Sequence, residues 1–267
     1  MSPDTVTSDT LPFVNSAHRY ADLSARIILP FFRQEIEISN KSDKNFDPVT
    51  TADRSAEEEI RRAITEDWPY HGILGEEFGV KEGTEDYQWI LDPIDGTSSF
   101  ITGLPVWGTL IGLQQGNRPV VGMMNQPFTE DRFWSDGKFT RYRGRTGEHI
   151  ISTRNCLSID QAVLSTTSPE LFDPGMEIDT FGKLRDAVRF TRYGMDCYAY
   201  CLLAAGHIDL VLEAGLKTHD IAPLIPVVEA AGGSVTSWQG GQVSTDGRVL
   251  ASGNARLHDR VLKLLNV

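Results

Sequence analysis

The sequence has few cysteines, and their number and spacing exclude two classes of protein. The 267 residues contain three cysteines, Cys156, Cys197 and Cys201. An odd number without paired spacing fits neither a disulfide framework nor a cysteine-ligated metal site. We therefore interpret them as ordinary thiols of a protein from a reducing cytoplasm.

Basic residues are also in the minority. The chain has 25 Lys and Arg against 37 Asp and Glu, which gives a formal net charge of −12. A surface that binds nucleic acid normally requires a basic stripe, so we expect no nucleic-acid partner. An anionic substrate would need local positive charge, which bound cations supply most simply.

Long apolar runs are missing as well. No run approaches the ~20 residues of a membrane span. The first residues, Met-Ser-Pro-Asp-Thr, lack the basic and then apolar pattern of a signal sequence. These features predict a soluble, cytoplasmic protein with no membrane partner.

The first half of the chain has the periodicity of two helices followed by strands. Apolar residues at helical spacing predict a helix over residues 14–33 and a second one from about Thr51 to Asp67. The run Glu57-Glu58-Glu59 is expected on the solvated face of the second helix. A short strand is expected within 72–79. Later strands are expected at 106–115, 118–125 and 131–135.

The pattern changes near residues 150 to 155, after which strands and helices alternate. This alternation predicts a mixed α/β second half. One of its helices is expected over Ile221–Ala231, with Asp220 at the N-cap and a kink at Pro226. We therefore predict an α+β or mixed α/β fold in two halves, 1–150 and 151–267.

Residues 89–100 combine an apolar run with two acids at its end. The run leads into Asp92 and Asp95 with a proline between them, and Gly96 and Thr97 follow with a flexible backbone and a hydroxyl. This combination is typical of a metal site that opens onto a phosphate site. A β-turn is the alternative, because Asp, Pro and Gly are common turn residues.

Other acids stand where predicted strands end or predicted helices begin. Glu76 follows a strand, and Asp53 and Asp220 stand at helix starts, where capping is the alternative role for Asp53. All these ligands are oxygens, which favours Mg²⁺, with Mn²⁺ as a substitute. If the acids converge with Asp92 and Asp95, their mutual repulsion makes a cation close to obligatory.

Three separated segments carry a resemblance to a known family. Gly75-Glu76-Glu77, the segment from Asp92 to Thr97, and His219-Asp220-Ile221-Ala222 resemble, in order and separation, the signature of the inositol monophosphatase superfamily of metal-dependent phosphatases. The resemblance spans roughly residues 14 to 260, and Asp53 stands in the expected place. It implies a layered αβαβα fold, with an antiparallel sheet in the N-terminal half and a smaller mixed sheet in the C-terminal half.

The resemblance also implies a role for each residue of the site. Up to three Mg²⁺ ions would be bound by Glu76, Asp92, the backbone oxygen of Ile94, Asp95 and Asp220. Phosphate would be held by Asp95, Gly96 and Thr97. Asp53 and Thr97, with Glu76, would orient and deprotonate the attacking water. Lys41 stands where the family often has a lysine near the water, and a solvated surface lysine is the alternative.

Within this superfamily the chain is most similar to histidinol-phosphate phosphatases. The similar stretches are Ser99–Pro105, Arg192–Tyr200 and Val211–Lys217, and Gly194 and Ser98 are predicted to line the substrate site. Histidinol carries an ammonium group and an imidazole, which Asp196 and Glu213 could meet with carboxylates, whereas inositol offers only hydroxyls. A helix N-cap is the alternative for Asp196, and a surface acid at a strand end is the alternative for Glu213.

These residues predict hydrolysis of L-histidinol phosphate, a step of histidine biosynthesis. An inositol-1-monophosphatase or a broad sugar-phosphate phosphatase is the alternative within the class. A non-catalytic relative that binds metal and phosphate is the alternative from another class.

Ser98 and His219 depart from the family pattern. Ser98 stands where a basic residue is common, and His219 stands where an aromatic residue is common. The resemblance further implies a homodimer, with strands that carry Trp107, Trp134 and Trp238 as interface material or core.

Overall fold

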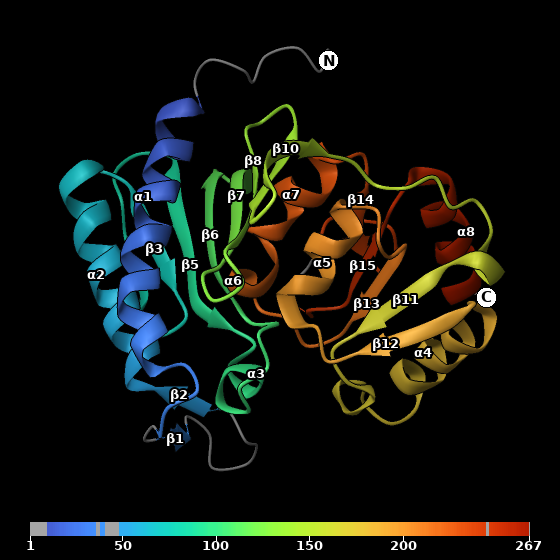
Figure 1. Cartoon of the computed structure of the whole chain (residues 1–267). Coiled ribbons are helices and arrows are strands. Elements are labelled where there is room, and N and C mark those ends of the chain that lie inside the picture. Colours follow the sequence, from blue (N-terminus) through green and yellow to red (C-terminus); the bar gives the residue numbers. More distant parts are fainter. Residues whose placement is uncertain (1–9, 36–37, 41–47, 244–245, 267) are drawn as a thin grey trace.

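Two long helices begin the chain and lie side by side on one face of the molecule. The computed structural model describes residues 10–35, 38–40, 48–243 and 246–266. Helix α1 spans Leu11–Ile28 and is followed by a short 3₁₀ turn, Leu29–Phe31, because Pro30 cannot donate a backbone hydrogen bond to the preceding turn. Helix α2 spans Thr51–Asp67, which confirms the predicted range (Figure 1). Lys41 lies outside the described residues.

Helix α2 differs from the prediction at one acid. Glu57 was expected on the solvated face, but its side chain is fully buried, whereas Glu58 is exposed. The expectation was wrong because Glu57 has partners inside the fold: the guanidinium of Arg61 and the backbone N–H groups of Glu77 and Phe78. A charge run in the sequence does not show whether one member turns inward to such donors.

The larger sheet has eight strands and follows the two helices. Its spatial order is β10-β9-β8-β7-β6-β5-β3-β4. Its neighbours pair antiparallel apart from β3 and β5, which are parallel, so the sheet is mixed and not purely antiparallel. The strands are β3 (Gly72–Gly75), β4 (Gly79–Lys81), β5 (Tyr87–Asp95), β6 (Gly108–Gln115), β7 (Arg118–Gln126), β8 (Asp131–Ser135), β9 (Thr140–Gly144) and β10 (Gly147–Ile151). A small separate ribbon pairs β1 (Ile38–Asn40) with β2 (Pro48–Thr50).

The smaller sheet has five strands in the order β12-β11-β13-β15-β14 and is mixed, as predicted. Its strands are β11 (Val163–Thr166), β12 (Phe190–Tyr193), β13 (Leu210–Glu213), β14 (Ser234–Ser237) and β15 (Val249–Ser252). The helices of this part are α4 (Met176–Ala187), α5 (Asp196–Ala204), α6 (Thr218–Ile221), α7 (Leu224–Ala230) and α8 (Ala255–Leu265). Short 3₁₀ turns lie at Ile159–Gln161 and Pro169–Leu171.

The helix expected over Ile221–Ala231 is two helices. Helix α6 already begins at Thr218, so Asp220 is its third residue and not its N-cap, which is Lys217. The break lies at Ala222 and Pro223, because a proline cannot donate to the preceding turn, and Pro226 stays inside α7. The predicted kink was therefore placed one turn too late.

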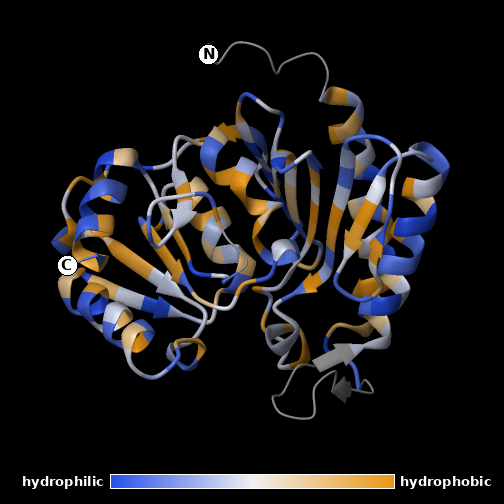
Figure 2. Ribbon diagram, turned by 180° about the vertical axis from the view of Figure 1, so that it is seen from behind, coloured by the Kyte–Doolittle hydropathy of each residue, from blue (hydrophilic) through white to orange (hydrophobic). Residues whose placement is uncertain are grey.

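The layers follow the predicted αβαβα order. Helices α1 and α2 cover the outer face of the large sheet, α5 to α7 fill the space between the two sheets, and α4 and α8 cover the far face of the small sheet (Figure 1). Hydrophobic residues concentrate in the strands and in the middle helices, and hydrophilic residues mark the outer helices (Figure 2). No helix among the described residues is long and apolar enough to cross a membrane.

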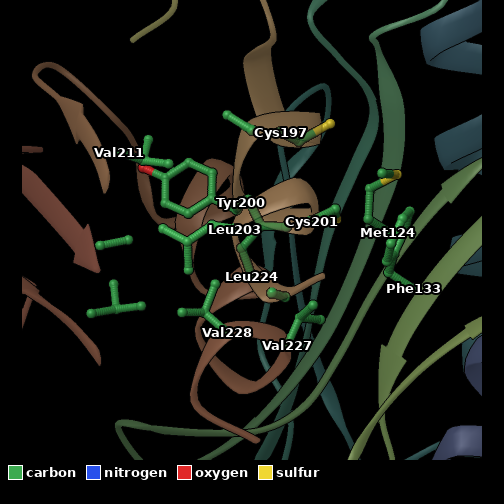
Figure 3. Close-up of a cluster of buried hydrophobic side chains, with 14 of the residues drawn as sticks. Met124, Phe133, Cys197, Tyr200, Cys201, Leu203, Val211, Leu224, Val227 and Val228 are labelled. Carbon is green, nitrogen blue, oxygen red and sulfur yellow. The ribbon is translucent and has the colours of Figure 1, made fainter. Parts of the chain in front are cut away.

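The middle layer joins the two sheets through one hydrophobic cluster. Leu203, Leu224 and Val228 of the middle helices pack with Met124 of the large sheet and Val211 of the small one (Figure 3). Trp107, Trp134 and Trp238 are all at most 4% exposed, so these side chains belong to the core, which was one of the two roles expected for them. The division at residues 150/151 stays a prediction.

Candidate active site

Three carboxylates converge where the large sheet meets the middle layer. Asp92 and Asp95 lie in the last residues of β5, and Asp220 lies in α6, more than a hundred residues later in the sequence. One carboxylate oxygen of each lies within 4.8 Å of the others. The pairing of β5 with β6 shifts register between Asp92 and Asp95, which interrupts the strand at the proline and turns both acids to the same place.

Local hydrogen bonds fix the end of β5. The N–H of Ile94 donates to Asp92 Oδ1 at 3.0 Å, and the hydroxyl of Thr109 donates to the carbonyl oxygen of Pro93 at 2.8 Å. Gly96, which follows the last residue of β5, has a left-handed backbone (φ 83°). This conformation allows α3 (Thr97–Ile101) to begin at the next residue. Thr97 Oγ1 donates to the carbonyl oxygen of Ile94 at 3.1 Å.

The second half of the chain contributes donors to this cluster. The N–H of Cys197, at the start of α5, donates to Asp95 Oδ2 at 2.7 Å. The N–H of Lys217 donates to Asp220 Oδ2 at 2.7 Å, and His219 Nε2 lies 3.3 Å from Asp220 Oδ1. The cluster is therefore held by the first turns of α5 and α6 as well as by the end of β5.

The negative charges gathered in the cluster favour the binding of a cation. Burial, together with the charges of Glu76, Asp95 and Asp220, raises the pKa of Asp92 well above its ordinary value. Burial and the neighbouring charges of Asp220 and Asp196 do the same to the pKa of Asp95, and burial raises the pKa of Asp220. An all-oxygen set of one buried and two half-buried acids that repel one another fits a hard divalent cation such as Mg²⁺.

Glu76 stands beside this cluster without belonging to its tightest group. Its charge raises the pKa values of Asp92, Asp53 and Asp220, so its carboxylate lies near all three. Its own N–H donates to the carbonyl oxygen of Leu91 at 3.2 Å, which ties the loop after β3 to β5. The group of three ligand atoms within 4.8 Å, however, consists of Asp92, Asp95 and Asp220.

Asp53 caps α2 with only one of its two oxygens. Its Oδ2 accepts from the backbone N–H of Thr50 at 2.9 Å and from the Thr50 hydroxyl at 2.5 Å. Its Oδ1 is buried and has no hydrogen-bond partner among the described residues. Burial, with the charge of Glu76, raises the pKa of Asp53 to about 6. The capping role is therefore real, and it leaves a second oxygen available for chemistry.

Asp196 lies against the glycine of the predicted phosphate loop. A Cβ placed on Gly96 would come 2.9 Å from Asp196 Oδ2, and that oxygen accepts from the Ser99 hydroxyl at 2.6 Å. Asp196 has a left-handed backbone (φ 42°), unusual for a residue with a side chain, and it is the first residue of α5 without capping it. The N-cap interpretation is thus wrong.

Glu213 is buried at the end of β13, so the surface-acid interpretation is wrong. It is 1% exposed, and its Oε1 accepts from the N–H and the hydroxyl of Thr167 at 2.8 and 3.1 Å. Its other oxygen, Oε2, accepts only a long bond of 3.4 Å from the Thr166 hydroxyl. Burial, with a contribution from the charge of Asp196, raises the pKa of Glu213 to about 8.

Some residues predicted to belong to the site do not contact the carboxylates, and some residues that do contact them were not predicted. Ser98 and Gly194 are exposed. The supporting donors Ser99, Thr167 and the backbone of Cys197 were not foreseen as such. Ser99 follows Ser98 in a run of hydroxyl residues, and only the fold shows which of the two turns inward.

A chain with this layered fold and this acidic cluster is a phosphatase of the inositol monophosphatase family, to which it belongs because the family pattern matches residues 11–266. Among its relatives, the bifunctional phosphatase IMPL2 of Arabidopsis thaliana is 43% identical over 265 residues, which cover 95% of this chain and 75% of that protein. The histidinol-phosphatase of Mycobacterium tuberculosis is 38% identical over 237 residues, covering 87% of this chain and 89% of the relative.

The fold has a close counterpart among solved structures. The structure of an inositol monophosphatase from Zymomonas mobilis matches 97% of this chain and 100% of its own, with a TM-score of 0.86 and 41% sequence identity. The αβαβα fold and the phosphatase class predicted from the sequence are thereby confirmed.

Proposed function

We propose that this phosphatase is Mg²⁺-dependent and hydrolyses L-histidinol phosphate to L-histidinol and phosphate. The observation that carries the substrate proposal is the pair formed by the half-buried Asp196 and the fully buried Glu213. The pair lies beside the acidic cluster, and the charge of Asp196 raises the pKa of Glu213. A cationic leaving group would stabilise both carboxylates, whereas the hydroxyls of an inositol would leave their charge uncompensated.

The residues at the end of β5 fit the metal role. Glu76, Asp92, the carbonyl oxygen of Ile94, Asp95 and Asp220 would hold the cations, with Mn²⁺ as a substitute for Mg²⁺. When bound, the cations supply positive charge that offsets the charge of the phosphate and makes a nearby water molecule more acidic.

The protein itself orients the water and the phosphate. Asp53 Oδ1, buried and without a protein partner among the described residues, would accept a proton of the attacking water, and its raised pKa suits a general base. The Thr97 hydroxyl donates a hydrogen bond to the carbonyl oxygen of Ile94, so the hydroxyl oxygen stays available as an acceptor for the same water. The N–H groups of Gly96 and Thr97 would donate to phosphate oxygens, together with the cations near Asp95.

Substrate recognition would use the carboxylates on the other side of the phosphate loop. Glu213 Oε2 is the less satisfied oxygen of its carboxylate, and an ammonium or imidazolium N–H would complete its hydrogen bonds. Asp196 Oδ2 already accepts from Ser99, which aims the carboxylate. Gly194 and Ser98, both exposed, would border the entrance.

The test is a comparison of two phosphate esters. With Mg²⁺, the purified protein should release phosphate from L-histidinol phosphate far faster than from inositol 1-phosphate. Inositol 1-phosphate is the second candidate substrate, because the similar solved structure is described as an inositol monophosphatase. Equal rates, or a preference for inositol 1-phosphate, would refute the histidinol proposal.

A homodimer, a cytoplasmic location and a step in histidine biosynthesis stay predictions. Sedimentation at micromolar concentration tests the first. Loss of the gene should produce a histidine requirement if the third holds.

A further inference from the structure

Glu57 is a buried acid that the phosphatase chemistry does not use, and it holds the loop that carries Glu76. Its Oε2 accepts from the N–H of Glu77 at 2.7 Å, and its Oε1 accepts from the N–H of Phe78 at 3.1 Å. The side chain is fully buried on the inner face of α2. A helix and the loop after β3 are thus joined through one carboxylate.

Arg61 compensates the charge of this buried carboxylate. Its Nε donates to Glu57 Oε1 at 2.7 Å, one helical turn away, and its other end donates to the carbonyl oxygen of Gly79. The Glu57 and Arg61 side chains therefore hold the loop at residues 77–78 and at residue 79, where β4 begins. A buried, paired carboxylate that accepts three donors is geometrically well defined.

The loop has little freedom left to move Glu76. The Glu76 N–H is tied to Leu91 in β5, and the next two N–H groups are tied to Glu57. Gly75 lies so close that a Cβ on it would overlap the Glu57 carboxylate, so the loop backbone packs directly on this side chain. The three consecutive N–H groups of residues 76–78 thus all have fixed acceptors.

We infer that Glu57 is a positioning residue that sets the place of Glu76 relative to Asp92, and thereby the affinity of the site for Mg²⁺. The inference rests on the proposed role of Glu76 as a metal ligand. A ligand held by fixed partners binds a cation more tightly than one on a loop that can swing, and loss of such a partner typically weakens metal affinity about 10–100-fold.

The experiment compares Glu57→Gln with Glu58→Gln in metal-free full-length protein, using Mg²⁺ titration calorimetry. The amide of Glu57→Gln keeps the size of the side chain but has only one acceptor oxygen, so at least one loop N–H loses its acceptor and Arg61 loses its charged partner. We expect its Mg²⁺ dissociation constant to rise about tenfold or more. Glu58→Gln makes the same change at the exposed neighbour and should stay within about twofold of the unaltered chain.

Activity assays separate positioning from a general loss of structure. In Glu57→Gln, saturating Mg²⁺ should restore kcat, and KM for the phosphate ester should stay unchanged. A merely structural role would lower the unfolding temperature equally with and without Mg²⁺ and leave the Mg²⁺ affinity of the folded protein intact. An affinity within about twofold of the unaltered chain would overturn the inference.

A second variant covers the case in which Glu57→Gln does not fold. Arg61→Met removes the donor to Gly79 and the counter-charge of Glu57, and we expect it to weaken Mg²⁺ binding about fivefold; unchanged binding would overturn the inference. Failure of the proposed function would give a different experimental result. Protein that binds Mg²⁺ but releases no phosphate from histidinol phosphate refutes the substrate and leaves the inference standing.

Discussion

The site contains two groups of buried and half-buried carboxylates, and their surroundings differ. Asp92, Asp95 and Asp220 bring oxygens within 4.8 Å of one another, so each charge raises the energy of the others. Glu213 is fully buried and Asp196 is half-buried. Asp196 accepts from a hydroxyl and Glu213 from hydroxyl and backbone donors, and the charge of Asp196 raises the pKa of Glu213 less than burial does.

We propose that this difference separates the reaction from the choice of substrate. The first group, in which the three carboxylates repel one another, suits cations of high charge. The second, already partly hydrogen-bonded, suits a singly charged organic cation that completes the remaining bonds. One group should therefore respond to metal and the other to the leaving group, and variants can test that division.

The largest effect is expected from Asp92→Asn. The amide removes one negative ligand while keeping an oxygen for the N–H of Ile94, so kcat should fall at least about 10³-fold, or about 4 kcal/mol of transition-state stabilisation. Without metal, the same variant should unfold at a higher temperature, because a buried repelling charge is gone. Phosphate release and thermal unfolding in EDTA measure the two effects. Activity within tenfold of the unaltered chain would contradict the metal role.

Adding Mg²⁺ should stabilise the fold through the first group alone. A cation at 100 times its dissociation constant adds about 2.7 kcal/mol to the free energy of unfolding. The unfolding temperature should therefore rise by several degrees between EDTA and Mg²⁺. The rise should persist in Glu213→Gln and shrink in Asp92→Asn. Equal rises in the two variants would break the division between the groups.

Asp196→Asn should affect substrate binding more than metal binding. The variant loses the charge that faces a cationic leaving group, so KM for histidinol phosphate should rise about tenfold, or about 1.4 kcal/mol. Steady-state kinetics on both esters provide the measurement, and inositol 1-phosphate should show little change. A matching loss for both esters would assign Asp196 to the reaction and not to the leaving group.

The last prediction concerns stability and pH in metal-free protein. Burial raises the pKa of Glu213 from its ordinary value near 4.5 to about 8, so the folded chain binds a proton that the unfolded chain releases. Its contribution is present below about pH 4.5 and is lost as the pH rises to about 8. Asp196 and Tyr200 are the titratable groups that face it.

Denaturant unfolding in EDTA at about pH 5 and about pH 8 tests this sign. The unaltered chain should lose stability over that interval, and Glu213→Gln should lose less, because its amide does not titrate. An identical pH dependence in the two proteins would show that Glu213 is already charged in the fold.

The sequence contains enough to predict the elements and the central motif, but not their side-chain partners. The acids of residues 92 and 95 stand out because they end an apolar run, and Thr51–Asp67 stands out by its periodicity. Glu57 could not be separated from Glu58, because the partners that bury it lie on a loop twenty residues later. The early start of α6 escaped detection because Lys217 is not a typical cap.

The convergence of Asp220 with β5 came from the family resemblance and not from spacing. No local pattern links residues more than a hundred positions apart, since the contact depends on how the middle layer packs between the sheets. The burial of Glu213 could not be predicted from the sequence for the same reason. Its burial depends on residues 166–167 of the neighbouring strand β11 and the loop that follows it.

The most direct test of the division is the ratio of kcat/KM for histidinol phosphate to that for inositol 1-phosphate, measured with saturating Mg²⁺ in the unaltered chain and in Glu213→Gln. We expect a large ratio in the unaltered chain and a fall of at least about tenfold in the variant, with the Mg²⁺ affinity unchanged. A ratio near one in the unaltered chain, or the same ratio in both proteins, would contradict the proposed role of the second carboxylate group.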